Sequence, residues 1–211
     1  MKLNKLPASA VILAGGQSRR MKEDKQQLIL NGQWLMGSLI SQLNTLFEEV
    51  IVVSNKPQLY QSLPVKVIQD VPSFKGLGPL AGMQASIQEM AYDSFFLTAC
   101  DMPKLSETLI RHQFSKLMND QTKGCLLQSK HQSIDLYPFH AFYHKSILSL
   151  LNKSLTQREL KLRYFIKQLP LSFIDFDAFN MNQSLDEWML NLNTPQERLD
   201  YEKLVERRLL T

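Results

Sequence analysis

The chain has 211 residues and a formal net charge of +4, with 44% apolar and 21% charged residues. This composition is ordinary for a folded globular protein and excludes an intrinsically disordered chain. The length favours a single domain. No apolar run approaches the roughly 18 residues of a membrane-spanning helix, and the N-terminal segment lacks the apolar stretch of a signal peptide. We therefore expect a cytoplasmic protein with no membrane partner.

The cysteines and histidines argue against a metal centre built from them. Cys100 and Cys125 are too few for a cysteine zinc site or a disulfide framework. His140 and His144 have a spacing that metal ligands use, but the segment between them has the pattern of a strand rather than a helix. The mild positive charge is dispersed along the chain, so it suits an anionic substrate and does not indicate nucleic acid.

Short apolar runs alternate with segments of helical spacing through the first 118 residues. The expected strands are 8–14, 50–53, 65–68 and 94–98, and the expected helices are 36–47, 80–90 and 105–117. Strands that read as continuous apolar runs are covered on both faces. The alternation therefore predicts an α/β fold, a single-domain, doubly wound, mostly parallel sheet with helices on both faces.

Beyond residue 118 the pattern is less regular. We expect strands at 123–129, 139–143 and 171–176, and helices near 145–151 and 156–168. A last helix should begin at Thr194, because a Thr N-cap, a Pro at the first helical position and a Glu at the third coincide there. No repeat or linker interrupts the chain, so we expect one domain over residues 1–211.

Glycine and polar residues gather just past the expected strand ends. Glycine is used where backbone turns sharply or approaches a ligand closely, and ligands of doubly wound sheets bind beyond the carboxyl ends of the strands. These positions therefore predict one binding site. They are Gly15, Gly16, Asn55, Asp70, Gly76, Gly78, Gly82 and Asp101.

The loop after the first strand combines two glycines with four cations. Gly15 and Gly16 expose backbone N–H groups, and positive charge follows within a dozen residues. Backbone donors and cations together suit a polyphosphate. A solvated surface loop is the competing interpretation. The loop is not a Walker loop, because no Gly-Lys-Ser/Thr ends it. The cations are Arg19, Arg20, Lys22 and Lys25.

Asp101 follows a buried strand within Thr98-Ala-Cys-Asp-Met-Pro103. A carboxylate at this place can reach the ligand crevice, and Mg²⁺ prefers one or two carboxylates together with phosphate oxygens. The competing interpretation is that Asp101 caps the next helix. Cys100 beside it is a packing residue rather than a nucleophile.

Five motifs in this order resemble the molybdenum cofactor guanylyltransferases. The resemblance runs from about residue 8 to residue 200. It implies a Rossmann-like nucleotidyltransferase fold, Mg²⁺ as cofactor, and transfer of GMP from GTP to the terminal phosphate of molybdenum-molybdopterin with release of pyrophosphate. The motifs are Leu13-Ala-Gly-Gly-x-Ser-x-Arg-Met21, Asp24-Lys25, Gly78-Pro-Leu-Ala-Gly82, Cys100-Asp-Met-Pro103 and Asn191-Leu-Asn-Thr-Pro195.

The resemblance also assigns roles to residues. Lys25, Arg19 and Arg20 would stabilise the leaving pyrophosphate, and Asp101 would bind Mg²⁺. Asn191 and Asn193 would hold a second metal or the acceptor, or form a polar turn. The part from about 8 to 118 would bind the nucleotide and the part from about 119 to 200 the acceptor. The implied nucleotide site is Leu13, Ala14, Gly15, Gly16, Lys25, Asn55, Asp70, Gly78 and Asp101.

The chain departs from the family pattern at two places, and three rival functions stay open. Lys22 stands where the family has glycine, and residues 156–159 stand where it has a small residue and a glycine. A relative that uses CTP would have Ala-Ala-Gly in place of Ala14-Gly15-Gly16, and the missing side chain at Gly15 favours a purine. A sugar-phosphate nucleotidyltransferase is disfavoured by the short chain, and a non-catalytic nucleotide-binding module is the third rival. Cofactor-biosynthesis proteins and molybdoenzyme chaperones are candidate partners.

Overall fold

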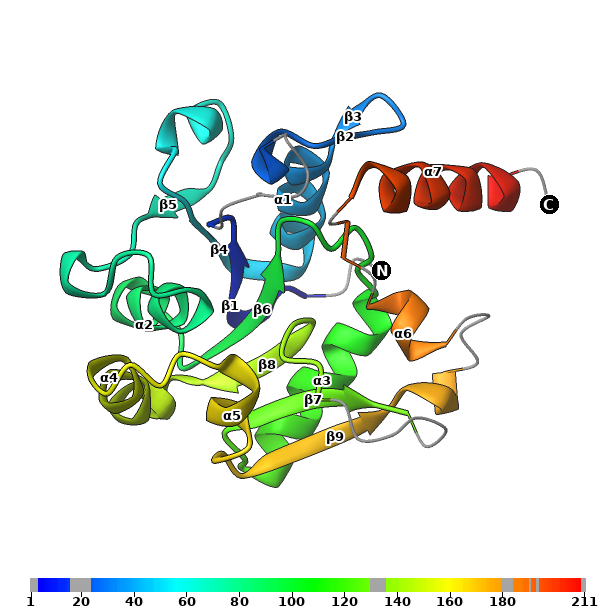
Figure 1. Ribbon diagram of the computed structural model, residues 1–211. Helices are drawn as coiled ribbons and strands as arrows, with labels where there is room; N and C mark the ends of the chain where they lie inside the picture. Colours follow the sequence, from blue (N-terminus) through cyan, green and yellow to red (C-terminus); the bar gives the residue numbers. More distant parts are fainter. Residues whose placement is uncertain are drawn as a thin grey trace.

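The computed structural model describes residues 4–15, 24–129, 136–179, 184–189, 191–192 and 194–209 (Figure 1). Its centre is a seven-stranded sheet in the order β5-β4-β1-β6-β8-β7-β9. Strand β8 runs antiparallel to both of its neighbours, and the other pairs are parallel. The strands are β1 (Leu6–Leu13), β4 (Phe47–Val53), β5 (Lys66–Ile68), β6 (Ser94–Ala99), β7 (Gly124–Gln128), β8 (Ala141–His144) and β9 (Leu171–Asp175).

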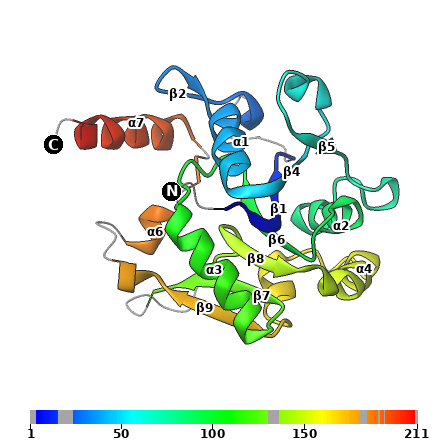
Figure 2. The same ribbon diagram turned by 180° about the vertical axis from the view of Figure 1, so that it is seen from behind.

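Helices cover both faces of this sheet, as the alternating pattern predicted. One apolar cluster joins a face of the sheet to α1 and α3, which lie in front in Figure 2. The other cluster joins the opposite face to α2, α4 and α5, which lie in front in Figure 1. The helices are α1 (Leu35–Leu46), α2 (Pro79–Glu89), α3 (Glu107–Asp120), α4 (Leu148–Thr156), α5 (Leu162–Ile166), α6 (Leu185–Trp188) and α7 (Pro195–Leu209).

Strand β1 shows why continuous apolar runs form the centre of the sheet. Ala10 and Ile12 belong to the cluster on one face, whereas Val11 and Leu13 belong to the cluster on the other. Neighbouring strand residues point to opposite faces, so a strand packed on both sides must be apolar throughout. The expected α/β fold with a mostly parallel sheet is confirmed.

Helix α7 begins where its sequence signal places it. The backbone N–H of Glu197 donates to Thr194 Oγ1 at 3.2 Å, which confirms the Thr194 cap. In both views the helix extends away from the sheet (Figures 1 and 2). Among the described helices, none has the length and apolar character needed to cross a membrane.

The structure corrects the expected helix over 156–168. Helix α4 ends at Thr156, and α5 covers only Leu162–Ile166. Arg158 between them has a φ of 59°, in the left-handed region that stops a right-handed helix. A small hairpin of β2 (Ile29–Leu30) and β3 (Gln33–Trp34) was not expected.

Candidate functional site

A cleft of about 560 Å³ opens at the carboxyl ends of β1, β4 and β6. From β1 the chain builds β4 and β5 on one side and then crosses to β6 on the other. Such a reversal of strand order is where doubly wound sheets bind ligands. The residues around the cleft are Leu13, Gly15, Asp24, Lys25, Gln26, Val53, Asn55, Lys56, Asp70, Gly76, Gly78, Pro79, Gly82, Ala99, Cys100, Asp101, Phe139 and Asn191.

Backbone hydrogen bonds continue beyond the strands and hold their ends together. The N–H of Ala14 donates to Val53 O at 2.9 Å, and the N–H of Cys100 donates to Leu13 O at 3.1 Å. The N–H of Ser54 donates to Ile68 O at 2.9 Å. The residues that follow therefore leave the sheet side by side and enter one cleft.

Lys25 and Asp101 meet in this cleft. Lys25 Nζ lies 2.5 Å from Asp101 Oδ2, and their side chains are 22% and 10% exposed. Lys25 starts a 3₁₀ turn, η1 (Lys25–Gln27), and Asp101 follows the end of β6. Lys25 and Asp101, 76 positions apart in sequence, therefore face each other.

Asp101 does not cap helix α3. That helix begins at Glu107, and Ser106 caps it by accepting a hydrogen bond from the N–H of Leu109 at 3.3 Å. The carbonyl of Asp101 instead accepts from the N–H of Leu192 at 3.0 Å, which brings Asn191 to the cleft. The interpretation of Asp101 as an N-cap is therefore wrong, and its carboxylate is available to the cleft.

The loop before α2 also lines the cleft. Gly76 and Gly78 have φ values of +77° and +78°, which side chains rarely adopt. Asp70 Oδ2 accepts a hydrogen bond from the N–H of Gly76 at 3.1 Å and so fixes this loop. At Gly82 an added Cβ would lie 2.8 Å from Leu13 Cδ2, so this glycine lets α2 pack closely on β1.

The structure brings most of the expected site residues together. Ala14 is buried and does not line the cleft, because its N–H continues the sheet. Gly16, Arg19, Arg20 and Lys22, and likewise Asn193, lie outside the described residues. The expected residues that do line the cleft are Leu13, Gly15, Lys25, Asn55, Asp70, Gly76, Gly78, Gly82, Asp101 and Asn191.

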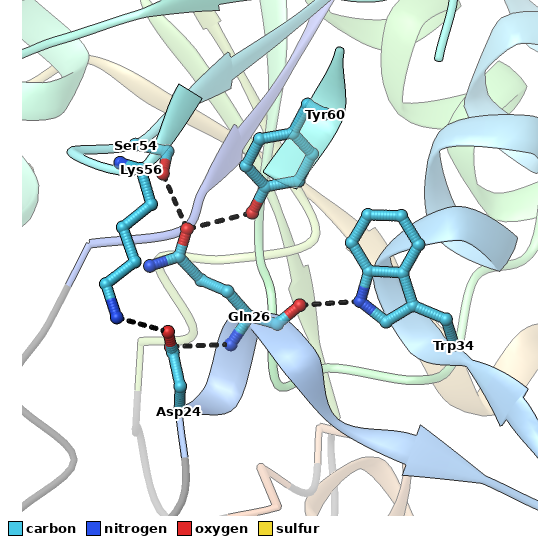
Figure 3. Close-up of polar contacts among 6 residues, drawn as sticks. All are labelled: Asp24, Gln26, Trp34, Ser54, Lys56 and Tyr60. Carbon is cyan, nitrogen blue, oxygen red and sulfur yellow. Dashed lines mark hydrogen bonds and ion pairs between the residues drawn. The ribbon is translucent and has the colours of Figure 1, made fainter. Parts of the chain in front are cut away.

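Sequence reasoning gave no role to Asp24, Gln26, Lys56 or Phe139, which also line the cleft. Lys56 Nζ lies 2.6 Å from Asp24 Oδ2, and Asp24 Oδ1 accepts the N–H of Gln26 at 3.1 Å (Figure 3). The signal available for Asp24 and Lys56 was their place next to Lys25 and Asn55. Nothing in the sequence marked Gln26 or Phe139.

Cys100 is buried, as expected of a packing residue. Burial raises the pKa of the Cys100 thiol to about 12, so the thiol stays protonated beside the cleft and is a poor nucleophile. Burial lowers the pKa of His140 to about 4. Within the described part of the chain, no three His, Cys, Asp or Glu side chains gather as a metal site.

Residues 10–172 match the family model described as the MobA-like NTP transferase domain. The chain belongs to this family. It is 33% identical to the molybdenum cofactor guanylyltransferase of Syntrophotalea carbinolica, and the match covers 92% of this chain and 89% of that protein. It is 30% identical to a probable molybdenum cofactor guanylyltransferase of Carboxydothermus hydrogenoformans, and the match covers 93% of this chain and 94% of that protein.

Solved structures share the fold. Molybdopterin-guanine dinucleotide biosynthesis protein A from Archaeoglobus fulgidus superposes with a TM-score of 0.79 at 19% identity, covering 94% of this chain and 99% of that one. A 2-C-methyl-D-erythritol 4-phosphate cytidylyltransferase from Thermus thermophilus gives a TM-score of 0.68 at 10% identity, with 95% and 100% covered. The MobA-like chain is therefore a nucleotidyltransferase of Rossmann-like fold, as the sequence motifs implied.

Proposed function

We propose that this MobA-like protein transfers GMP from GTP to the terminal phosphate of molybdenum-molybdopterin and releases pyrophosphate. The relatives reported above are named molybdenum cofactor guanylyltransferase and probable molybdenum cofactor guanylyltransferase, which supports this proposal. The observation that carries the proposal is the contact between Lys25 and Asp101 inside a cleft at the strand-order reversal. A cation for phosphate oxygens and a carboxylate for a metal thus stand within reach of one nucleotide.

The reaction needs no side-chain nucleophile. An oxygen of the acceptor's terminal phosphate forms a bond to the α-phosphorus of GTP, the bond to the bridging oxygen breaks, and its electron pair leaves with pyrophosphate. Two anions must approach in line, so the barrier is mainly orientational and electrostatic. In our proposal Lys25, with Arg19 and Arg20, stabilises the charge of the leaving pyrophosphate.

The residues present fit Mg²⁺ as the cofactor. Asp101 offers one carboxylate at the cleft wall, and Mg²⁺ at nucleotide sites is held by one or two carboxylates together with phosphate oxygens and water. When bound, Mg²⁺ would neutralise charge on the phosphates. Asp101 would orient the ion, and Asn191, which also lines the cleft, would contact the acceptor or a second ion.

Gly15 supports GTP over CTP. An added Cβ at Gly15 meets no atom of the described structure within 4 Å, and its φ is not in the left-handed region. Neither packing nor backbone conformation therefore requires glycine, so the free space can serve the ligand. A purine base needs more room than a pyrimidine, which is our reason to assign the guanine here.

The proposal also includes a division of labour within one domain. Residues from about 8 to 118 contribute nearly all of the cleft wall, and we assign them to the nucleotide. We assign residues from about 119 to 200, which supply Phe139 and Asn191, to the acceptor. A cytoplasmic location and contacts with cofactor-biosynthesis proteins or molybdoenzyme chaperones complete the proposal.

A pyrophosphate-release assay with GTP, CTP and ATP in separate reactions tests this function. We expect release with GTP only when molybdenum-molybdopterin is present, and loss of release when EDTA replaces Mg²⁺. Release with CTP would assign a different nucleotide. GTP binding without release under any of these conditions would identify a non-catalytic binding module and overturn the proposal.

A further inference from the structure

Both neighbours of Lys25 are bonded to one segment of the chain, the connection after β4 (Figure 3). Asp24 pairs with Lys56, and the Gln26 side chain bonds to Ser54 and Tyr60. Lys25 itself reaches the other way, to Asp101. In a 3₁₀ turn successive side chains are about a third of a turn apart, so fixing its neighbours also fixes the direction of Lys25.

Gln26 makes the buried one of the two connections between η1 and the segment after β4. It is 6% exposed, and its Oε1 accepts hydrogen bonds from Ser54 Oγ at 2.5 Å and from the Tyr60 hydroxyl at 2.9 Å. Its backbone carbonyl accepts from Trp34 Nε1 at 2.6 Å. In Figure 3 the side chain of Gln26 thus bonds to the connection after β4 and its carbonyl bonds to Trp34 of β3, so η1 has little freedom to rotate.

The hydroxyl protons fix the orientation of the Gln26 carboxamide. Ser54 Oγ already accepts the N–H of Lys56 at 2.9 Å, which leaves its own proton to donate to Gln26 Oε1. Burial raises the pKa of the Tyr60 hydroxyl, so this group also keeps its proton. A buried hydroxyl needs an acceptor, and Oε1 serves both.

The second connection, the ion pair between Lys56 and Asp24, is weaker. Lys56 and Asp24 side chains are 50% and 21% exposed, and exposed ion pairs add little to the stability of one conformation. A buried acceptor that loses its donors costs more. Gln26, rather than the surface pair, should therefore decide where Lys25 lies.

We propose that Gln26 is a positioning residue that holds Lys25 at the triphosphate through its bonds to Ser54 and Tyr60. This inference rests on the proposed function, because it gives Lys25 the phosphate-binding role. Gln26 also lines the cleft, and the role assigned to it here acts through the turn that it shares with Lys25. Its side chain connects the turn to the rest of the fold through two buried hydrogen bonds.

Gln113 offers a matched control for Gln26. It is also buried, and its Nε2 donates to Cys125 O at 3.3 Å and His140 O at 2.8 Å, in the other half of the sheet. Gln26→Leu and Gln113→Leu thus each remove a buried carboxamide with two bonds. We expect both to lower Tm, but only Gln26→Leu to lower kcat/KM for GTP, by about 10- to 100-fold for a displaced catalytic group.

Coupling to Lys25 separates positioning from general damage. In a Lys25→Met background, adding Gln26→Leu should cause little further loss, because residues that act as a unit are not additive. Adding Gln113→Leu should change the rate no more than it does alone. Equal kcat/KM losses for the two glutamine variants, or a full multiplicative loss in Lys25→Met/Gln26→Leu, would overturn the inference.

Two further measurements keep the test decisive. If Gln26→Leu does not fold, Tyr60→Phe removes one donor to Oε1, and Tyr143→Phe, which loses its bond to Pro138 O at 2.8 Å, is its control. Titration calorimetry with GTP distinguishes the failures. A wild-type protein that binds GTP without transferring it refutes the proposed function. In a wild-type protein that does transfer GMP, equal kcat/KM values for wild type and Gln26→Leu refute the role of Gln26.

Discussion

Replacing Asp101 with alanine should reduce turnover far more than GTP binding. The carboxylate lies at the end of β6 with Oδ2 2.5 Å from Lys25 Nζ. If it holds the ion that neutralises the phosphates, its loss removes stabilisation that matters most in the transition state. Loss of one such electrostatic group lowers kcat by about 10²- to 10³-fold, or about 2.7–4 kcal/mol.

GTP binding should weaken by less than about tenfold, or 1.4 kcal/mol. Lys25 and the glycine loop before α2 remain to contact the phosphates. The folded state should lose about 1.5–3 kcal/mol, the usual contribution of a hydrogen bond to a charged group, because the pair is only partly exposed. Lys25 has further interactions, so it does not become an isolated charge. At about 2–4 °C per kcal/mol, Tm should fall by several degrees.

The assay compares kcat from coupled pyrophosphate release with the Kd for GTP from calorimetry, each at a temperature well below Tm. Asp101→Asn is the matched control, since it keeps the size of the side chain and removes its charge. Both variants should show the kcat loss. Equal losses of kcat and GTP affinity would refute the reasoning, because Asp101 would then hold the nucleotide rather than the reacting metal.

Three other changes test the site and the fold. Gly15→Ala should leave Tm unchanged, because the new Cβ meets no described atom within 4 Å. The same substitution should reduce the kcat/KM preference for GTP over CTP about tenfold. An unchanged preference would exclude Gly15 from base selection. Gly82→Ala places Cβ 2.8 Å from Leu13 Cδ2 and should lower the free energy of unfolding in urea by about 1–3 kcal/mol. An unchanged unfolding midpoint would show that α2 or the Leu13 side chain can shift to make room. Burial lowers the pKa of His140 from 6.5 to about 4, so the folded state disfavours the protonated imidazole. The free energy of unfolding should therefore decline as the pH falls from 6.5 toward 4, by up to about 3 kcal/mol at 1.36 kcal/mol per pH unit. His140→Asn should flatten that pH dependence of unfolding, and an equal slope in both proteins would assign it to other groups.

The sequence predicted the sheet well where burial leaves a local signal. The stretches 10–13 of β1 and 50–53 of β4 are apolar because both faces are covered, and this pattern is readable without coordinates. Asp101 was expected at the cleft because ligands of doubly wound sheets bind beyond the carboxyl ends of the strands, and Lys25 because of its cationic loop and the family resemblance. Their direct contact confirms that these two side chains share one cleft.

Several features of the fold depended on signals that were weak or were overlooked. The Asn31-Gly32 turn of the β2–β3 hairpin, with both φ values positive, is a sequence typical of two-residue hairpin turns. The capping box of Ser184 and Glu187 also marked α6. The left-handed Arg158 gave no such signal, because arginine rarely adopts that conformation.

The support of Lys25 could not be predicted from sequence. Gln26 becomes buried only when η1 packs against the segment after β4, 28 to 34 positions away. A polar residue beside a charged loop ordinarily indicates a surface. Long-range packing reversed that expectation here, and it also explains why the 24–26 segment keeps a defined geometry next to the cleft.

Transfer of label from GTP radiolabelled at its α-phosphate to purified molybdenum-molybdopterin, with and without Mg²⁺, tests the central claim most directly. We expect a labelled dinucleotide product with Mg²⁺, none with EDTA, and a large loss of product in Lys25→Met and Asp101→Ala alike. Undiminished labelling in either variant would contradict a site in which these two side chains act on one magnesium-bound triphosphate.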